Sequence, residues 1–121
     1  MIKSSMFVLA VPNLEVSAKF YRDILGFEIH EIGDAGWRMY VKDDCCIMAG
    51  ECPDAMSPNK LGDHSYFGYL VVDHADRYND KLKANNVEII NTIKDEPWNM
   101  REFPIRTVDG HRIMVGQRIN E

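Results

Sequence analysis

Residues 11–27 read VPNLEVSAKFYRDILGF and contain the signals for the end of a strand, a helix and the start of a second strand. Pro12 ends a short apolar run of the kind that forms a buried strand. Asn13 can cap a helix, because its side chain can accept a hydrogen bond from a backbone N–H group. Apolar residues then recur at helical spacing as far as Leu25, and Gly26 can end the helix because it enters the left-handed conformation without a Cβ clash.

Further strands are predicted outward from this stretch, from apolar or alternating runs bounded by turn residues. In the first half, the expected strands cover residues 6–11, 27–32, 37–41 and 45–50. In the second half, strands are expected at residues 65–72, 87–90, 98–107 and 111–118, a helix capped by Asp73 and closed by Asn85-Asn86, a loop at 95–97 and a hairpin turn at Asp109-Gly110.

The second half of the chain repeats the first. Residues 26–29 match residues 86–89 at an offset of 60, Trp37 matches Trp98 at 61, and residues 47–50 match residues 113–116 at 66. The larger final offset predicts a second hairpin that is five residues longer. Several matches in order indicate an internal duplication. We therefore predict an α+β fold, one domain of two βαβββ modules: module one at about 1–51, a linker at about 52–63 and module two at about 64–121.

Composition excludes several classes of protein. Hydrophobic residues make up 45% of the chain and charged residues 27%, which is typical of a soluble globular protein. The net charge of −5 and a pI near 5.3 argue against a nucleic-acid partner. No apolar run approaches the length of a membrane span or a signal-peptide core, so we expect no membrane partner. Three cysteines without C-x-x-C spacing, Cys45, Cys46 and Cys52, predict reduced thiols and a cytoplasmic location.

Two stretches resemble a known superfamily. Residues 11–17, followed by F-Y-x-x-x-L-G-F at 20–27, are similar to the opening of the vicinal oxygen chelate superfamily. The pattern W-x-x-R-E-F at 98–103, followed by D-G-H at 109–111, is similar to its ending. The superfamily includes glyoxalase I, bleomycin-resistance proteins, fosfomycin-resistance transferases and extradiol dioxygenases. The resemblance implies paired βαβββ modules that each curl a sheet into half of a cup, and a homodimer whose cups are often completed across the interface.

The same resemblance implies where a catalytic member would hold a divalent metal ion. Its ligands are His, Glu or Gln, one from each of up to four strands, and the matching positions here are Met6, Met48, Phe67 and Met114. Thioethers bind soft copper, and Phe offers no donor atom, whereas hard divalent ions require carboxylate or imidazole. His64 is the one imidazole nearby in sequence, and it falls on the opposite strand face or in the preceding loop. We therefore expect no metal and no cofactor.

A cup floored by these four side chains would be soft and apolar, which suits an adaptable binding surface. Trp37 and Trp98 would offer flat stacking surfaces at its rim, and Glu102 could pair with a cationic ligand or act as a base. The predicted ligand-binding residues are Met6, Trp37, Met48, Phe67, Trp98, Glu102 and Met114. Alternatively, the four floor residues fill the cup as core, each Trp packs in the core, and Glu102 forms a salt bridge with a neighbouring arginine such as Arg38 or Arg101.

The sequence therefore favours a metal-free small-molecule-binding protein of the glyoxalase/bleomycin-resistance type. It would sequester an amphipathic or cationic ligand in a pocket at a homodimer interface. The alternative is a metal-dependent glyoxalase-like lyase or isomerase, or a dioxygenase, in which the metal uses other residues such as Glu102, His64 or Cys45. A third possibility is an interaction module whose cup is filled by its own side chains.

Overall fold

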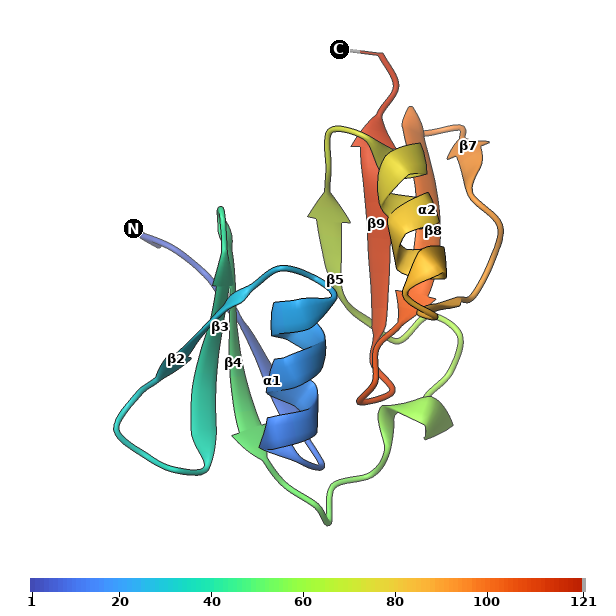
Figure 1. Cartoon of the computed structure of the whole chain (residues 1–121). Helices are drawn as coiled ribbons and strands as arrows, with labels where there is room; N and C mark the ends of the chain where they lie inside the picture. Colours follow the sequence, from blue (N-terminus) through green and yellow to red (C-terminus); the bar gives the residue numbers. More distant parts are fainter. Residues whose placement is uncertain (121) are drawn as a thin grey trace. The chain divides into compact units, whose positions relative to one another are not determined.

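A computed structural model describes residues 1–120, and the chain divides into a first compact unit, Met1–Ser57, and a second that begins at Pro58 (Figure 1). This division falls inside the stretch expected to be a linker. The first unit contains β1 (Phe7–Val11), α1 (Leu14–Asp23), β2 (Glu28–Glu31), β3 (Trp37–Lys42) and β4 (Cys45–Glu51). The second contains a 3-10 turn, η1 (Pro58–Lys60), then β5 (Tyr66–Val71), α2 (Ala75–Ala84), β6 (Glu88–Ile89), β7 (Lys94–Glu96), β8 (Met100–Arg106) and β9 (Arg112–Arg118).

The first unit is a four-stranded sheet in the order β1-β4-β3-β2, with α1 packed on one face. β1 runs parallel to β4, and the other neighbours are antiparallel. Strand alternation directs Leu9, Ile47 and Tyr40 toward the helix, where all three are buried. The Tyr40 hydroxyl donates a hydrogen bond to Ser17 Oγ of α1 at 2.8 Å, so helix and sheet are joined by a buried polar contact as well as by apolar packing.

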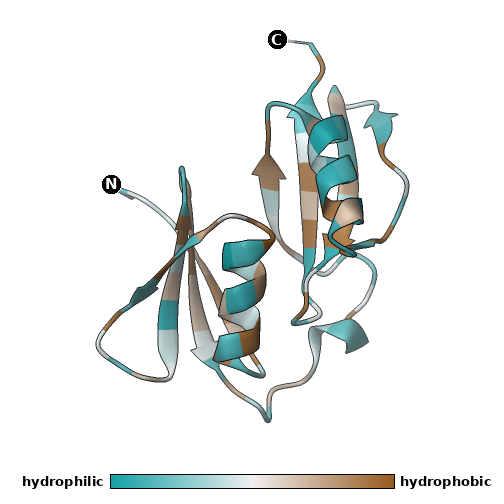
Figure 2. Ribbon diagram, viewed as in Figure 1, coloured by the Kyte–Doolittle hydropathy of each residue, from teal (hydrophilic) through white to brown (hydrophobic). Residues whose placement is uncertain are grey.

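The second unit is a five-stranded sheet in the order β5-β9-β8-β6, in which β7 also pairs with β8. β5 runs parallel to β9. α2 contacts the sheet through Leu82, above the buried side chains Phe103, Ile113 and Val115. Figure 2 shows hydrophilic residues along much of both helices, whereas the strands behind them carry hydrophobic stretches. The chain thus has the predicted α+β architecture of two sheets and two helices, and residues 1–120 contain no helix with the length and hydropathy of a membrane span.

The helix ends follow the sequence signals with one exception. Asn13 Oδ1 accepts from the Val16 N–H at 3.1 Å, and Gly26 ends the segment after α1 with φ of +79°. The prediction that Asp73 caps α2 is wrong. The cap position is His74, which makes no side-chain capping bond, and Gln117 Oε1 on β9 accepts from the first helical N–H, that of Ala75, at 2.9 Å. A neighbouring strand thus satisfies a donor that a local cap would otherwise satisfy.

The position of the extra length in the second half also differs from the prediction. Gly50 pairs with Trp37, and its repeat partner Gly116 pairs with Glu102, so Trp37 matches Glu102 at an offset of 65 and does not match Trp98. The five extra residues therefore lie before β8, and the second hairpin is longer by only one residue. They include β7, a short strand where a loop was predicted, which adds to the edge of β8 that β6 leaves unpaired.

Candidate functional site

A pocket of about 500 Å³ lies on the second unit, on the sheet face that points away from α2. Strand alternation places Glu102 of β8 and Met114 of β9 on this face, and it places their neighbours Phe103 and Val115 on the helix side. The pocket lining includes Tyr66 and Trp98, the carboxylates of Asp63, Glu96 and Glu102, the cations Lys94 and Arg112, and also His64, Pro104 and Met114. The pocket therefore combines aromatic, apolar and charged walls.

Glu102 is the most deeply buried charged group in this lining, with an exposed fraction of only 6%. Its Oε2 atom accepts two hydrogen bonds, one from the Tyr69 hydroxyl on β5 and one from the Trp98 indole N–H at 3.2 Å. No other residue among 1–120 bonds its second oxygen, Oε1, and no lysine or arginine of that range forms an ion pair with it. A buried carboxylate without a cation is costly, because it has lost water and gained no opposite charge.

The two arginines considered as partners of Glu102 are engaged elsewhere, so neither of them forms a salt bridge with it. Arg101 follows the opposite strand face and donates to both carboxylate oxygens of Asp76 on α2 at 2.9 Å and to Asp95 at 3.0 Å. These hydrogen bonds raise the pKa of Arg101. Arg38 belongs to the first unit, where it lies 3.8 Å from Glu31. Strand alternation separates Arg101 from Glu102 even though the two are adjacent in sequence.

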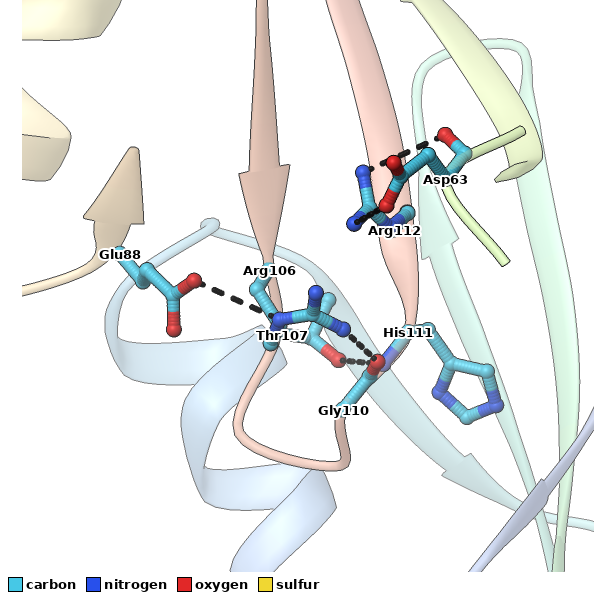
Figure 3. A network of polar contacts seen from close by, with 7 residues as sticks. All are labelled: Asp63, Glu88, Arg106, Thr107, Gly110, His111 and Arg112. Atoms are coloured by element: carbon cyan, nitrogen blue, oxygen red, sulfur yellow. Dashed lines mark hydrogen bonds and ion pairs between the residues drawn. The ribbon is translucent and has the colours of Figure 1, made fainter. Parts of the chain in front are cut away.

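The other charges of the pocket are paired. Arg112 lies 3.2 Å from Asp63 Oδ1, and Lys94 lies 3.3 Å from Glu96. Figure 3 shows the Arg112 pair beside the β8–β9 hairpin, where Arg106 Nη1 donates to the Gly110 carbonyl at 2.9 Å. These contacts hold one end of the pocket in place. They leave Glu102 as the carboxylate of the pocket without a cationic partner in the described chain.

Tyr69 holds the Glu102 carboxylate from the neighbouring strand. Burial, followed by the hydrogen bond to Glu102, raises the pKa of the Tyr69 phenol, so it remains a proton donor at neutral pH. Its ring lies against Gly116, where a Cβ atom would come within 2.9 Å of the phenol Cζ. Glycine at this strand position therefore makes room for the tyrosine. The sequence analysis missed Tyr69, although a glycine inside a strand was the available signal.

The family model described as the Glyoxalase/Bleomycin resistance protein/Dioxygenase superfamily matches residues 3–115. The chain belongs to this superfamily. No curated protein matches the sequence.

Solved structures share the superfamily fold over nearly the whole chain. TnmS3, an antibiotic binding protein from Streptomyces sp. CB03234, is 22% identical, with 98% of each chain covered and a TM-score of 0.75. UcmS2 is 17% identical, covering 96% of this chain and 98% of its own, with a TM-score of 0.79. Lactoylglutathione lyase from Agrobacterium tumefaciens is 16% identical, covering 96% and 94%, with a TM-score of 0.70. At these identities the likeness establishes the fold and leaves the activity open.

The predicted site residues are divided between the two units. Trp98 and Met114 line the pocket with Glu102. Phe67 lies at a register irregularity of β5, and its ring packs edge-on against His111 at 5.5 Å. In the first unit, Trp37 and Met48 lie on the sheet face away from α1, and Met6 precedes β1 with 48% of its surface exposed.

The side chains expected at the superfamily's metal positions do not fit a hard divalent ion. Met6 and Met48 in the first unit, and Met114 in the second, offer thioethers, and Phe67 offers no donor. Across residues 1–120, no three His, Cys, Asp or Glu side chains come together in a group that could hold a metal. His64, the imidazole considered as a substitute, lies in the loop before β5 and lines the pocket without such companions.

Proposed function

We propose that this protein binds a small amphipathic molecule through a cationic group, without a metal cofactor and without chemical conversion of the ligand. The observation that carries the proposal is Glu102, a buried carboxylate on the pocket wall whose Oε1 atom accepts no hydrogen bond and which forms no ion pair with residues 1–120. An ammonium group on a ligand would supply the missing charge. Since the pocket excludes part of the solvent, this pairing would be worth more there than on an open surface.

The remaining pocket walls suit the apolar part of such a ligand. The Trp98 indole is 60% exposed, and its N–H is held by Glu102, so a rigid aromatic face stands beside the carboxylate. A cation near Glu102 would also lie close to this ring, which favours positive charge. Pro104 and Met114 add apolar surface, and methionine adapts to ligands of varied shape. Met6, Trp37, Met48 and Phe67 remain proposed ligand contacts outside this lining.

Binding is favoured over catalysis by the chemistry of the donor positions. A metal-dependent lyase, isomerase or dioxygenase would need carboxylate or imidazole where this chain has thioethers and a phenyl ring. TnmS3, which shares the fold, is named as an antibiotic binding protein. That name supports a binding role, and together with the buried Glu102 carboxylate it makes antibiotics that carry an amine group a ligand class to examine.

We further propose that a second copy of the chain completes the pocket in a homodimer, in the cytoplasm. β1 and β5 are edge strands of their sheets, and they carry exposed apolar side chains: Val8 at 62% and Val71 at 53%. Exposed apolar edges of this kind are normally covered. Sedimentation velocity at micromolar protein should give a dimer, and a monomer with full ligand affinity would contradict this part of the proposal.

The test compares a panel of aromatic amines with their N-acetylated counterparts, such as 1-naphthylmethylamine and its acetamide, by isothermal titration calorimetry. We expect the amines to bind more tightly, and we expect Glu102→Gln to lower their affinity by at least about tenfold, since a charge-assisted contact is worth roughly 1.5–3 kcal/mol. Glu28→Gln is the matched control, because Glu28 is an exposed carboxylate of the first unit.

Equal affinity for amine and acetamide, or an unchanged affinity in Glu102→Gln, would contradict the cationic site. Divalent-metal-dependent turnover of a glutathione hemithioacetal, abolished by Glu102→Gln, would establish the enzymatic alternative instead.

A further inference from the structure

The face of the first sheet that points away from α1 carries sulfur and imidazole side chains on three adjacent strands. Met39 of β3 is the central residue. Its cross-strand partner on one side is His30 of β2, and its partner on the other side is Met48 of β4. Directly opposed residues share a sheet face, with Cβ atoms only about 4.5–5.5 Å apart. The three side chains therefore form one row across the sheet.

Cys46 adds a thiol to this row. It lies two residues before Met48 on β4, so it points to the same face, and its Sγ donates to Met39 Sδ at 3.2 Å. Both sulfur-bearing residues are partly buried, which shields them from bulk water while leaving them reachable. The adjacent Cys45 points to the other face, and burial raises the pKa of its thiol.

These donors are soft. Thiolate and thioether sulfur select Cu(I), and imidazole is an accepted additional ligand, whereas Zn²⁺ structural sites use several thiolates or imidazoles and Mg²⁺ or Mn²⁺ sites use oxygen. One thiol, two thioethers and one imidazole thus suit a soft monovalent ion and no common divalent ion. Only Met48 coincides with a position at which the superfamily places a metal ligand.

We propose that the first unit binds one Cu(I) ion through Cys46, Met39 and Met48, with His30 as a further ligand. On binding, the Cys46 thiol loses its proton to water and its sulfur donates an electron pair to copper. The two thioethers donate lone pairs without losing a proton, and copper stays Cu(I) throughout. The proposed copper ligands belong to the first unit, whereas the Glu102 pocket belongs to the second.

The test is an anaerobic titration of the full chain with Cu(I), kept reduced by ascorbate, in competition with bicinchoninate. Every variant carries Cys52→Ser, because the exposed Cys52 thiol would otherwise add a background site. We expect one Cu(I) per chain. Cys46→Ser should lower the affinity by about a hundredfold and Met39→Leu by about tenfold, the range seen when ligands or their close partners are lost.

Two control variants accompany the titration. Cys45→Ser removes the neighbouring thiol from the opposite face, and Met56→Leu removes an exposed methionine of the same unit. Both should bind Cu(I) as the parent does, and X-ray absorption at the copper edge should show sulfur neighbours that decrease in Met39→Leu.

Absence of Cu(I) binding, equal binding in Cys46→Ser, or loss of binding in Cys45→Ser would each overturn the proposal. Met39→Leu should bind aromatic amines with the affinity of the parent. This measurement therefore tests the copper site separately from the proposed amine-binding function.

Discussion

The two units share a plan but differ at one matched position. In the first, Trp37 stands opposite Gly50 on the sheet face away from the helix, and its indole lies over the glycine. In the second, the matching residue is Glu102, opposite Gly116, and the Tyr69 phenol from the neighbouring strand lies over the glycine instead. The space above the glycine is filled by an indole ring in the first unit and by a phenol bonded to a carboxylate in the second.

This difference explains why the charged site is found in the second unit. The Trp37 indole covers Gly50 with the carbon atoms of its six-membered ring and brings no charged group to the sheet. A phenol over glycine covers the sheet too, but its hydroxyl reaches Glu102 and holds a carboxylate where water is scarce. The two units thus differ at a matched position, where the second has a polar site and the first has an apolar cover.

Substitution of the two glycines should have the largest effect. Gly116→Ala should destabilise the chain by about 2–3 kcal/mol, because the new Cβ displaces the Tyr69 phenol and leaves Glu102 with one donor fewer. Amine binding should weaken as well. Gly50→Ala should cost about 1–3 kcal/mol through its clash with Trp37 at 2.7 Å, without changing amine affinity.

Urea unfolding gives the stabilities, and calorimetry gives the affinities. Equal loss of amine affinity in Gly50→Ala and Gly116→Ala would contradict the view that only the glycine of the second unit supports the amine site.

A smaller effect should follow from removing only the phenol hydroxyl. Tyr69→Phe keeps the ring over Gly116 but deletes the donor to Glu102, which should cost about 1–2 kcal/mol of stability. Tyr66→Phe is the control, since Tyr66 also lines the pocket but its hydroxyl has no partner among residues 1–120. Equal unfolding midpoints for Tyr69→Phe and the parent would argue against the phenol–carboxylate contact.

The smallest predicted effect is on the stability of the chain at acidic pH. Burial lowers the pKa of His111 below its usual 6.5, and His111 belongs to the second unit. A lowered folded-state pKa means that the unfolded chain takes up the proton first, so this contribution to stability is present above pH about 6.5 and is lost as pH falls through the folded-state value.

The fall in urea midpoint between pH 7.5 and 5.5 should therefore be smaller in His111→Gln than in the parent. An identical pH dependence in His111→Gln and in the parent would rule out His111 as the source.

Local patterns were sufficient to predict most of the elements. The signals at Asn13 and Gly26 depend on residues a few positions apart, and the structure has the predicted cap and turn at both. The cap of α2 was not predictable in this way, because its acceptor is Gln117 on a strand far along the chain.

The site was harder to predict from the sequence, because it depends on the register in which the strands pair. Trp98 and Glu102 were identified from the motif that carries them, and both line the pocket. Tyr69 was missed, since its contact with Glu102 joins residues 33 positions apart. The wrong partner for Trp37 had the same cause: sequence offsets placed the extra residues in the hairpin, whereas the ladder places them before β8.

Arg101 and Glu102 stand side by side on β8, one directed to the α2 carboxylate of Asp76 and the other to the pocket. A shift of one residue in the pairing of β8 would exchange them, because neighbouring side chains of a strand face opposite ways. Because the length of its loop fixes the register of a hairpin, the loss or gain of a single residue in the turn between β8 and β9 would then deliver a guanidinium to the binding face. Descendants of this module could thereby turn from attracting amines to attracting acids without a single substitution.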